Sequence, residues 1–426
     1  MRHLLVDLTP LREHRDFRLL WIGQAVTFFG SMITYVAIPY QVFHLTGSTW
    51  LVGLLGAVEF VAVVSTALVG GALADAVDRR RMVRLTEGAL LVCSLGLALN
   101  ATTEHPSVVA LFVLAGLMTV CDALQRPSLD ALLPRLVPPS QLIPAGALGS
   151  LRVTTGMIVG PAVGGLLVQW LGLPGTYLVD VCTFAVSLVA LQLMRAVPPP
   201  PDAERPSLQG IADGLRYARS RPELMGTYLV DINAMFFGMP NALFPALATA
   251  YGGASVLGLL YSAPAVGSLL ASVTSGWTKQ VRRHGLAVLW AAGLWGLAIL
   301  GFGLAPWLWL ALLFLGLAGA ADMVSGLFRM TIWNTTIPDH LRGRLAGIEM
   351  ISYSTGPTLG NVEAGAVAAA TTPRFSAGLG GVLCVAGTLV LAALLPEFRR
   401  YRSAEPEEHR AGADVGLDEH HLDPRP

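Results

Sequence analysis

The sequence predicts an all-α integral membrane protein whose twelve transmembrane helices form two pseudo-symmetric six-helix bundles. Three observations predict this fold class: a composition poor in charge, apolar runs of membrane-spanning length, and an internal repeat. Of the 426 residues, 54% are hydrophobic and 13% are charged, whereas soluble domains contain roughly 25% charged residues. A folded surface with so few charges must largely face lipid.

Twelve apolar runs reach the length of about 20 residues that a membrane-spanning helix needs. We place them at 17–43, 51–74, 83–101, 107–129, 144–171, 174–195, 224–250, 254–277, 286–304, 306–331, 345–370 and 375–396. The longest polar break separates six runs from six. We therefore expect an N-terminal bundle (1–195), a cytoplasmic linker (196–223), a C-terminal bundle (224–398) and a polar, disordered cytoplasmic tail (399–426).

The positions of the basic residues predict the orientation, because cytoplasmic loops retain Lys and Arg. With both termini in the cytoplasm, every inner segment carries at least one basic residue, and the outer loops carry only Arg374. We expect a multi-pass protein of the cell membrane with both termini cytoplasmic. In the linker, Ile211, Leu215 and Tyr217 among arginines favour a short amphipathic helix on the inner membrane surface. The alternative is a plain linker.

Several classes of function are disfavoured. A net charge of zero argues against a nucleic-acid partner. Lys279 is the only lysine and follows no glycine-rich loop, so the chain has no ATP-binding Walker A motif. The four cysteines lie in apolar runs without disulfide or metal spacing, and no cluster has the composition of an enzyme active site. We expect no cofactor, no metal, no ATP and no enzymatic activity.

Asp122 and Asp322 indicate an internal repeat with an offset of about 200 residues. Each is followed sixteen residues later by a proline, Pro138 or Pro338. The repeat places an acid at the same depth of the fourth and tenth spans. Two parallel halves related by an axis along the membrane normal produce such a pattern.

The loop between the second and third predicted spans reads GGALADAVDRRR, from Gly70 to Arg81. Together with the twelve runs, it resembles the major facilitator superfamily. The matching positions of the loop signature are Gly71, Leu73, Asp75, Arg79 and Arg80, whereas Ala76 and Asp78 depart from it. The resemblance implies two six-helix halves that alternate in access to the two sides of the membrane.

The same resemblance implies a charged latch at this loop in the outward-facing state. Asp75 and Arg79 would form it, and the fourth-span acid Asp122 would join it. Arg126 lies one helical turn from Asp122 and can pair with it near the cytoplasmic end. Ordinary anchoring by cytoplasmic arginines is the alternative, although it leaves Asp75 unexplained.

The fifth predicted span contains GMIVGPAVGG, which matches a pattern that exporters of the superfamily carry. Its matching residues are Gly156, Gly160, Pro161, Gly164 and Gly165. Small residues let helices approach closely, and proline bends the span. The alternative is a tight helix crossing that has no bearing on the direction of transport.

More narrowly, stretches such as RPSLDALLPRLVPPSQL and LRGRLAGIEMISYSTGPTLG resemble the branch of enterobactin exporters and macrolide-efflux-type proteins. The resemblance covers the chain except for its tail and implies proton-coupled export of a siderophore, a macrolide or another amphiphilic small molecule. One departure is that no basic residue occurs between Ser107 and Cys121, where many proton antiporters carry an arginine. Gradient-driven import of a small nutrient is the alternative, and a non-transporting receptor is a third interpretation.

Charged residues inside spans cost roughly 2.5 to 3.5 kcal/mol each on insertion scales, so each is a candidate for function. The acids are Glu59, Asp122, Asp180, Asp231, Asp322, Glu349 and Glu363, and the bases are Arg126, Arg152 and Arg329. A carboxyl group inside the protein can take up a proton on one side of the membrane and release it on the other. The candidates for this role are Glu59, Asp231, Glu363 and Asp322.

Contacts to the substrate are expected from the first, fourth, seventh and tenth spans. Aromatic walls with a few hydrogen-bonding groups suit an amphiphilic molecule. The candidates are Gln24, Phe28, Tyr35, Asn233, Phe237 and Asn241. Core packing is the alternative for each aromatic residue. The expected partners are a small-molecule substrate, protons and membrane lipid, and we expect a monomer.

Overall fold

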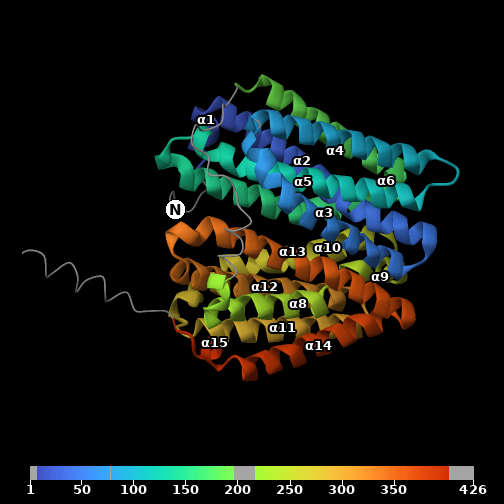
Figure 1. Ribbon diagram of the computed structural model, residues 1–426. Helices are drawn as coiled ribbons and strands as arrows, with labels where there is room; N and C mark the ends of the chain where they lie inside the picture. Colours follow the sequence, from blue (N-terminus) through green and yellow to red (C-terminus); the bar gives the residue numbers. More distant parts are fainter. Residues whose placement is uncertain (1–6, 77, 196–215, 403–426) are drawn as a thin grey trace, which may run out of the picture.

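A computed structural model describes residues 7–76, 78–195 and 216–402, apart from the side chains of 67–76 and 339–353. This part of the chain is helical throughout and contains no strand. Its helices form two groups, which lie one above the other in Figure 1. In lipid, helices satisfy every backbone hydrogen-bonding group within one segment, which explains this architecture.

The first group holds the N-terminal half of the chain and begins with the short helix α1. Its members are α1 (Thr9–Glu13), α2 (Arg15–Thr46), α3 (Thr49–Ala76), α4 (Arg79–Thr102), α5 (Val108–Leu136), the 3-10 turn η2 (Pro139–Gln141) and α6 (Leu142–Leu193).

The second group holds the C-terminal half and ends with the short helix α15. Its members are α8 (Pro222–Gly238), η3 (Asn241–Leu243), α9 (Phe244–Tyr251), α10 (Ala254–Val273), η4 (Ser275–Gln280), α11 (His284–Leu304), α12 (Leu308–Thr336), α13 (Asp339–Ala370), α14 (Pro373–Leu394) and α15 (Pro396–Arg400).

The helices agree with the predicted runs, with two differences in how the runs are divided. Spans 144–171 and 174–195 both fall in α6, which Gly172 interrupts with a φ of 67° that favours glycine. Span 224–250 is divided between α8 and α9 by η3. Nine helices of the described ranges are long and apolar enough to cross a membrane. The fold class is confirmed, and the count of twelve crossings stays a prediction.

The internal repeat has a structural counterpart in α5 and α12. Each helix has 29 residues, and each carries its acid, Asp122 or Asp322, fourteen residues after its first residue. α5 continues to Leu136, beyond the predicted end at residue 129. Pro127 and Pro134 lie inside the helix and do not end it.

The predicted linker and tail are only partly described. The predicted amphipathic helix lies mostly within 196–215, outside the described residues, but the Tyr217 hydroxyl donates to the Thr336 carbonyl at 2.9 Å. The tail begins later than predicted. α15 covers residues 399 and 400, because Phe398 is fully buried. Residues 403–426 lie outside the described part.

Both cores include residues of the opposite half. Val36 of α2 belongs to the apolar core of the C-terminal half. Ala242 and Ala254 belong to that of the N-terminal half. The two halves therefore meet in a packed contact near η3 and the start of α10.

The halves touch mainly through two helix pairs, α6 with α10 and α3 with α13. A Cβ atom built on Gly165 would lie 2.6 Å from the Ala254 carbonyl oxygen and 2.8 Å from the Gly258 nitrogen. One built on Gly365 would lie 2.9 Å from the Gly53 Cα. Small residues thus bring the backbones of the two halves into direct contact.

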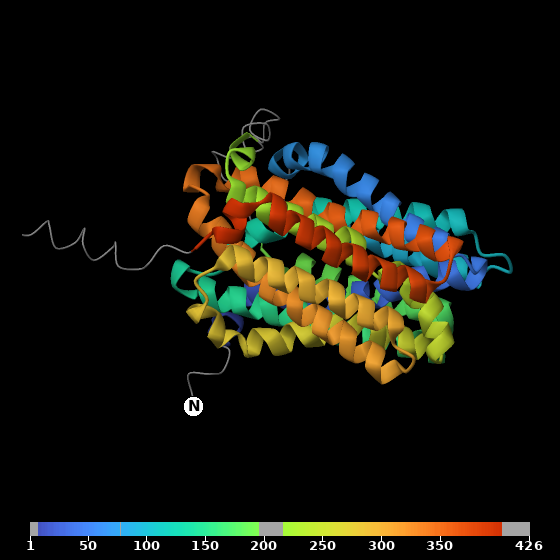
Figure 2. The ribbon, with the colours of Figure 1, turned by 90° about the horizontal axis from the view of Figure 1, so that it is seen from below.

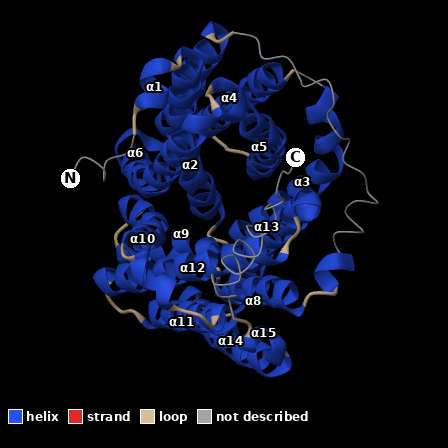
Figure 3. Cartoon of the chain, turned by 90° about the vertical axis from the view of Figure 1, so that its left-hand side faces the viewer, coloured by secondary structure: helices blue, strands red, loops and turns tan. Residues whose placement is uncertain are grey.

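These glycine contacts lie toward one end of the molecule, where Gly47 ends α2 and Gly252 and Gly253 join α9 to α10. α1 and α15 both lie at the opposite end, α1 in the upper group and α15 in the lower (Figure 1). Figure 3 views the helices from that opposite end and shows the two groups, with α3 beside α13. We call the end with the glycine contacts the closed end.

We predict that Gly165→Val separates α6 from α10 at the closed end, because the added side chain would collide with the backbone of α10. Such overpacking costs about 1–3 kcal/mol. The midpoint of thermal unfolding of the purified protein, followed by tryptophan fluorescence, should therefore fall. Gly146→Val on the same helix is the control, since a Cβ atom there meets no atom within 4 Å. Equal midpoints for the two variants would contradict the contact.

Candidate functional site

A cavity of about 620 Å³, here called the central cavity, lies between the two halves. Most of its walls are apolar, with Met157, Met235, Phe244 and Leu315 among them. The polar groups include Glu59, Thr119, Ser268 and Asp322. An apolar cavity of this size with a few polar groups suits an amphiphilic small molecule.

The central cavity is lined by more helices than predicted. Besides α2, α5 and α12, residues of α3, α6, α10, α11 and α13 contribute to its wall. The predicted set of spans one, four, seven and ten was therefore too narrow. Tyr261 of α10 lines the central cavity and a smaller side cavity, and Asn361 of α13 lines the side cavity. The sequence offered no signal to separate these two residues from core residues.

One hydrogen bond between the halves and two within the C-terminal half cover the cavity toward the closed end. The Asn241 amide donates to the Tyr35 hydroxyl at 2.9 Å, and the Tyr261 hydroxyl donates to the Asn241 carbonyl at 3.3 Å. The Tyr35 and Tyr261 rings meet edge to face at 5.3 Å. The Ala242 amide donates to the Asn361 side-chain oxygen at 3.1 Å. We call Tyr35, Asn241, Tyr261 and Asn361 the roof.

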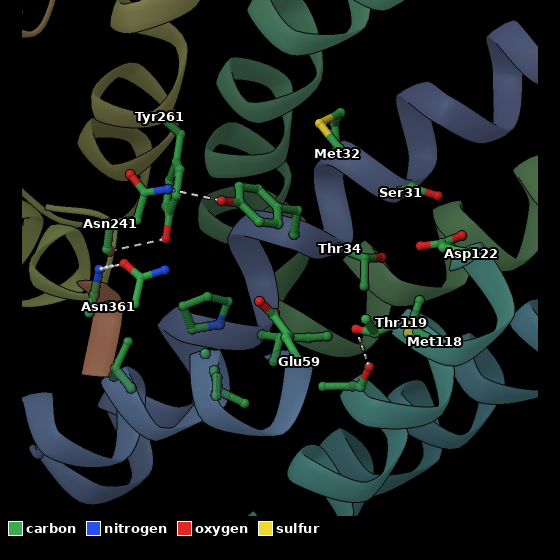
Figure 4. A pocket seen from close by; sticks show the side chains of 18 residues that line it. Ser31, Met32, Thr34, Glu59, Met118, Thr119, Asp122, Asn241, Tyr261 and Asn361 are labelled. Carbon is green, nitrogen blue, oxygen red and sulfur yellow. Dashed lines mark hydrogen bonds between the residues drawn. The ribbon is translucent and has the colours of Figure 1, made fainter. Parts of the chain in front are cut away.

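Glu59 of α3 lies in the wall of the central cavity and also borders a side cavity of about 150 Å³. Figure 4 shows the carboxylate of Glu59 between Tyr261 and Asn241 on one side and Thr119 and Asp122 on the other. Within the described part of the chain, this carboxylate has no hydrogen-bond or ion-pair partner. It is therefore a charge-bearing group open to a ligand or a proton.

Asp122 differs from its predicted position near the cytoplasmic end. It lines the side cavity with Ser31, Thr34 and Glu59, halfway along α5, because that helix continues to Leu136. Among the described residues, no ion pair joins Asp122 to Arg126. The predicted pair is thus not formed in this arrangement.

Asp231, Asp322 and Arg329 form a charged cluster in the C-terminal half. Arg329 of α12 makes an ion pair with Asp231 of α8. Its second terminal nitrogen lies 3.5 Å from an Asp322 oxygen. Asp231 is buried, whereas 42% of the Asp322 side chain is exposed, toward the central cavity. The cluster links α8 to α12 and reaches the cavity at one carboxylate.

Two further acids are buried in the N-terminal half. Asp180 accepts hydrogen bonds from Thr34 and Ser94, both at 2.7 Å, and so joins three helices. Glu87 is fully buried and accepts from the amides of Gln24 at 2.5 Å and Gln125 at 3.2 Å. Glu87 is not among the predicted site residues, although it lies within the predicted span 83–101.

Arg152 of α6 borders a second cavity of the N-terminal half, about 570 Å³, lined also by Trp21, Gln24 and Asp130. Thr154 lines both this cavity and the central cavity, so the two adjoin. The Arg152 guanidinium lies over the Phe28 ring, 5.9 Å from its centre. Its Nε atom is buried and has no hydrogen-bond partner in the described ranges. We call this region the arginine pocket.

Three of the predicted site residues point elsewhere. The Asn233 amide donates to the Cys384 carbonyl at 3.0 Å, and Phe237 packs against the C-terminal core. Both face α14 instead of the cavity, because they lie on the opposite side of α8 from Met235. Glu363 lines neither the central cavity nor the side cavity.

The loop signature binds helix ends together. Arg79 donates to the Ala131 carbonyl of α5 at 3.0 Å. Arg80 donates to the carbonyls of Leu191 and Gln192 of α6, each at 2.8 Å. Basic side chains stabilise the carbonyl ends of helices in this way. The backbone of α3 includes Gly71 and Asp75, but the side chain of Asp75 lies outside the described part.

The glycine motif of α6 packs in two directions. Gly156, Gly160 and Gly164 follow one face and contact Phe28, Met32 and Ile33 of α2. Gly165 and Pro161 instead face α10, in the other half. A spacing of four residues places the first three glycines on one side of the helix. The motif therefore serves both packing within the half and the contact between halves.

The chain is similar to characterised transporters over nearly its full length. Residues 6–419 match the family described as transmembrane secretion effector. The enterobactin exporter EntS of Shigella boydii serotype 4 (strain Sb227) is 32% identical over 405 residues, which cover 95% of this chain and 97% of that protein. The enterobactin exporter EntS of Citrobacter koseri is 31% identical over 403 residues, covering 94% and 97%.

Solved structures confirm the fold. The nucleoside transporter NupG has a TM-score of 0.71 at 13% identity, covering 91% of this chain and 99% of its own. A bacterial homologue of the iron transporter ferroportin, in an inward-facing state, has a TM-score of 0.66 at 14% identity, covering 90% and 98%. The relatives that the chain matches are membrane transporters and not enzymes. The chain thus belongs to the transmembrane secretion effector family of the major facilitator superfamily.

Proposed function

We propose that the protein is a proton-coupled exporter of an amphiphilic small molecule, such as a siderophore of the enterobactin type, and that it works by alternating access. The observation that carries the proposal is the central cavity, which both halves line and which glycine contacts and the roof cover at one end. The names of the two relatives support the direction and the substrate class.

The distribution of arginines supports a cell-membrane protein with both termini cytoplasmic. Arg12, Arg15, Arg399 and Arg400 lie at the end that carries α1 and α15, opposite the closed end. In this orientation the closed end faces outward. The cavity would then receive its substrate from the cytoplasm, as an exporter requires, and the chain is expected to do this as a monomer.

Glu59 is the best candidate for the proton site. An unpaired carboxylate inside a membrane protein is costly, so it has a strong tendency to bind a proton or a cationic group. Glu59 faces both cavities beneath the roof. When the halves rock, the same residue would become accessible from the outside, where the proton gradient supplies protons.

Asp231 and Asp322 have a different role in this proposal. Arg329 compensates the charge of Asp231, which makes proton uptake by Asp231 less necessary. Asp322 shares the same arginine at 3.5 Å and faces the central cavity. A substrate that contacts Asp322 would alter its pairing with Arg329. Asp322 is therefore the residue through which a bound substrate would affect the charged cluster. Glu363 lines neither cavity, so we expect it to be dispensable for transport.

The arginine pocket supports an acidic or aromatic substrate. Arg152 lies over the Phe28 ring, and its Nε hydrogen is donated to no acceptor among the described residues. This hydrogen is therefore available to an acceptor on the substrate. A guanidinium group recognises acidic groups through directional hydrogen bonds and stacks on planar rings. Trp21 and Gln24 line the same pocket. A substrate that extends from the central cavity past Thr154 would place an acidic or aromatic group in the arginine pocket.

Inverted membrane vesicles test the proposed function, because their lumen corresponds to the outside of the cell. With enterobactin as the probe, vesicles with an acidified lumen should accumulate the compound, and a protonophore should collapse the accumulation. Accumulation that needs ATP and ignores the protonophore would contradict the proposal. Accumulation in right-side-out vesicles instead would indicate import.

We predict that Glu59→Gln removes the stimulation by the pH gradient and reduces accumulation to the level seen with a protonophore. The amide has the size of the carboxylic acid but cannot release a proton. Exchange of labelled for unlabelled substrate, which needs no net proton movement, should persist. Glu363→Gln is the matched control, since Glu363 lies outside both cavities. Gradient-driven accumulation by Glu59→Gln would exclude this site.

We predict that Arg152→Gln raises the substrate concentration for half-maximal transport by about tenfold or more, because a hydrogen bond to a charged group contributes about 1.5–3 kcal/mol. The control is Arg374→Gln, since Arg374 also lies over a ring, that of Tyr251, at 5.3 Å, but away from the cavities. Initial rates over a range of substrate concentrations measure the effect. An equal change in both variants would argue against a substrate contact.

We predict that Arg329→Met destabilises the protein by about 3–5 kcal/mol, because it leaves the buried Asp231 without a counter-charge. Adding Asp231→Leu to the same chain should restore part of the lost stability, since both charges are then absent. Thermal unfolding of the purified single and double variants checks this expectation. A double variant less stable than Arg329→Met would show that the pair itself is not the cause.

A further inference from the structure

A third large hollow lies on the outer side of α12, away from the central cavity. It measures about 610 Å³ and runs between α11 and α12. Its lining includes Trp277, Arg283, Trp290, Leu294, Leu317 and Phe328, and nearly all of it is apolar. We call it the α11–α12 groove. Figure 2 shows these two helices side by side along the surface of the C-terminal half.

The groove opens toward the membrane. Trp290 is 67% exposed and Leu294 is 54% exposed, although both are large apolar residues. Asp322, which faces the central cavity, lies on the other side of α12 from Leu317. The groove follows α11 from Arg283 to Ala298, or about 22 Å at 1.5 Å per residue. One leaflet is about 15 Å thick, so the groove spans the whole of it.

Basic residues surround one mouth of the groove. Lys279, Arg282 and Arg283 lie within five residues, at the turn from η4 into α11, and all three are exposed. No Asp or Glu occurs in the sequence between Asp231 and Asp322, so this segment has no acid of its own. In the described part of the chain, Lys279 and Arg283 form no ion pair. The mouth is therefore a positively charged site above an apolar channel.

We propose that the α11–α12 groove is a binding site for an anionic phospholipid of the inner leaflet. The phosphate group would lie at Lys279 and Arg283, and one acyl chain would follow Trp290 and Leu294 toward the middle of the membrane. An exposed apolar groove in lipid accepts any acyl chain, but basic residues at headgroup depth favour an anionic headgroup over a zwitterionic one. Charge complementarity therefore selects the occupant.

Native mass spectrometry of the purified full-length protein tests this site, with phosphatidylglycerol and phosphatidylethanolamine of identical acyl chains as probes. We expect the wild type to retain phosphatidylglycerol in preference, by about tenfold given two or three basic groups near the headgroup. Lys279→Gln with Arg283→Gln should remove this preference. The control is Arg12→Gln with Arg15→Gln, which loses the same charge in the other half and should keep it.

A second variant tests the apolar channel separately from its mouth. Ala320→Phe fills the groove where Ala320 of α12 lines it, so it should lower the retention of both lipids. A wild type without preference would overturn the proposal, as would equal loss in the two double variants. Retention unchanged by Ala320→Phe would place the lipid elsewhere. A dimer that phosphatidylglycerol does not displace would instead make a second copy of the chain the occupant.

Discussion

The arrangement of the molecule depends on direct backbone contact between its halves at the closed end. Gly165 meets the backbone of Ala254 and Gly258, and Gly365 meets Gly53, with no side chains between them. The backbone packing gains van der Waals energy, of which a gap of about 0.5–1 Å already removes a quarter to a half. The Thr49 hydroxyl adds a hydrogen bond to the Gly365 carbonyl at 3.2 Å. In the proposed alternating-access cycle, this interface would be either closed, as here, or separated. The roof and the access to Glu59 follow from which state is occupied.

The charges inside the bundle fall into three kinds. Asp231 is paired with Arg329, and Glu87 and Asp180 accept hydrogen bonds from neutral side chains. These arrangements satisfy the acids within the protein, so they can serve structure alone. Glu59 differs, because its carboxylate faces open volume without a partner among the described residues. An unsatisfied charge at this depth is hard to explain by stability, which is why we assign it to coupling.

The sequence was sufficient to predict the fold class and to identify α5 and α12 as equivalent helices of the internal repeat. The length of the apolar runs and the spacing of Asp122 and Asp322 do not depend on tertiary contacts. It could not decide which side of a helix faces the cavity. In a membrane the lipid, the core and the cavity wall are all apolar, so Asn233 and Asn241 look equivalent in sequence. The environment of Glu87 likewise depends on helices far away in the chain.

α12 connects the features that this structure places in the C-terminal half. Asp322 faces the central cavity, Arg329 pairs with α8, and Leu317 and Phe328 line the outer groove. A helix is rigid over such a length, so a tilt of α12 against α11 that changes the cavity would also move the wall of the groove. A lipid held there would then bind the two states of the transporter unequally. By linkage, that difference would shift the balance between the states, and the membrane's composition would influence transport.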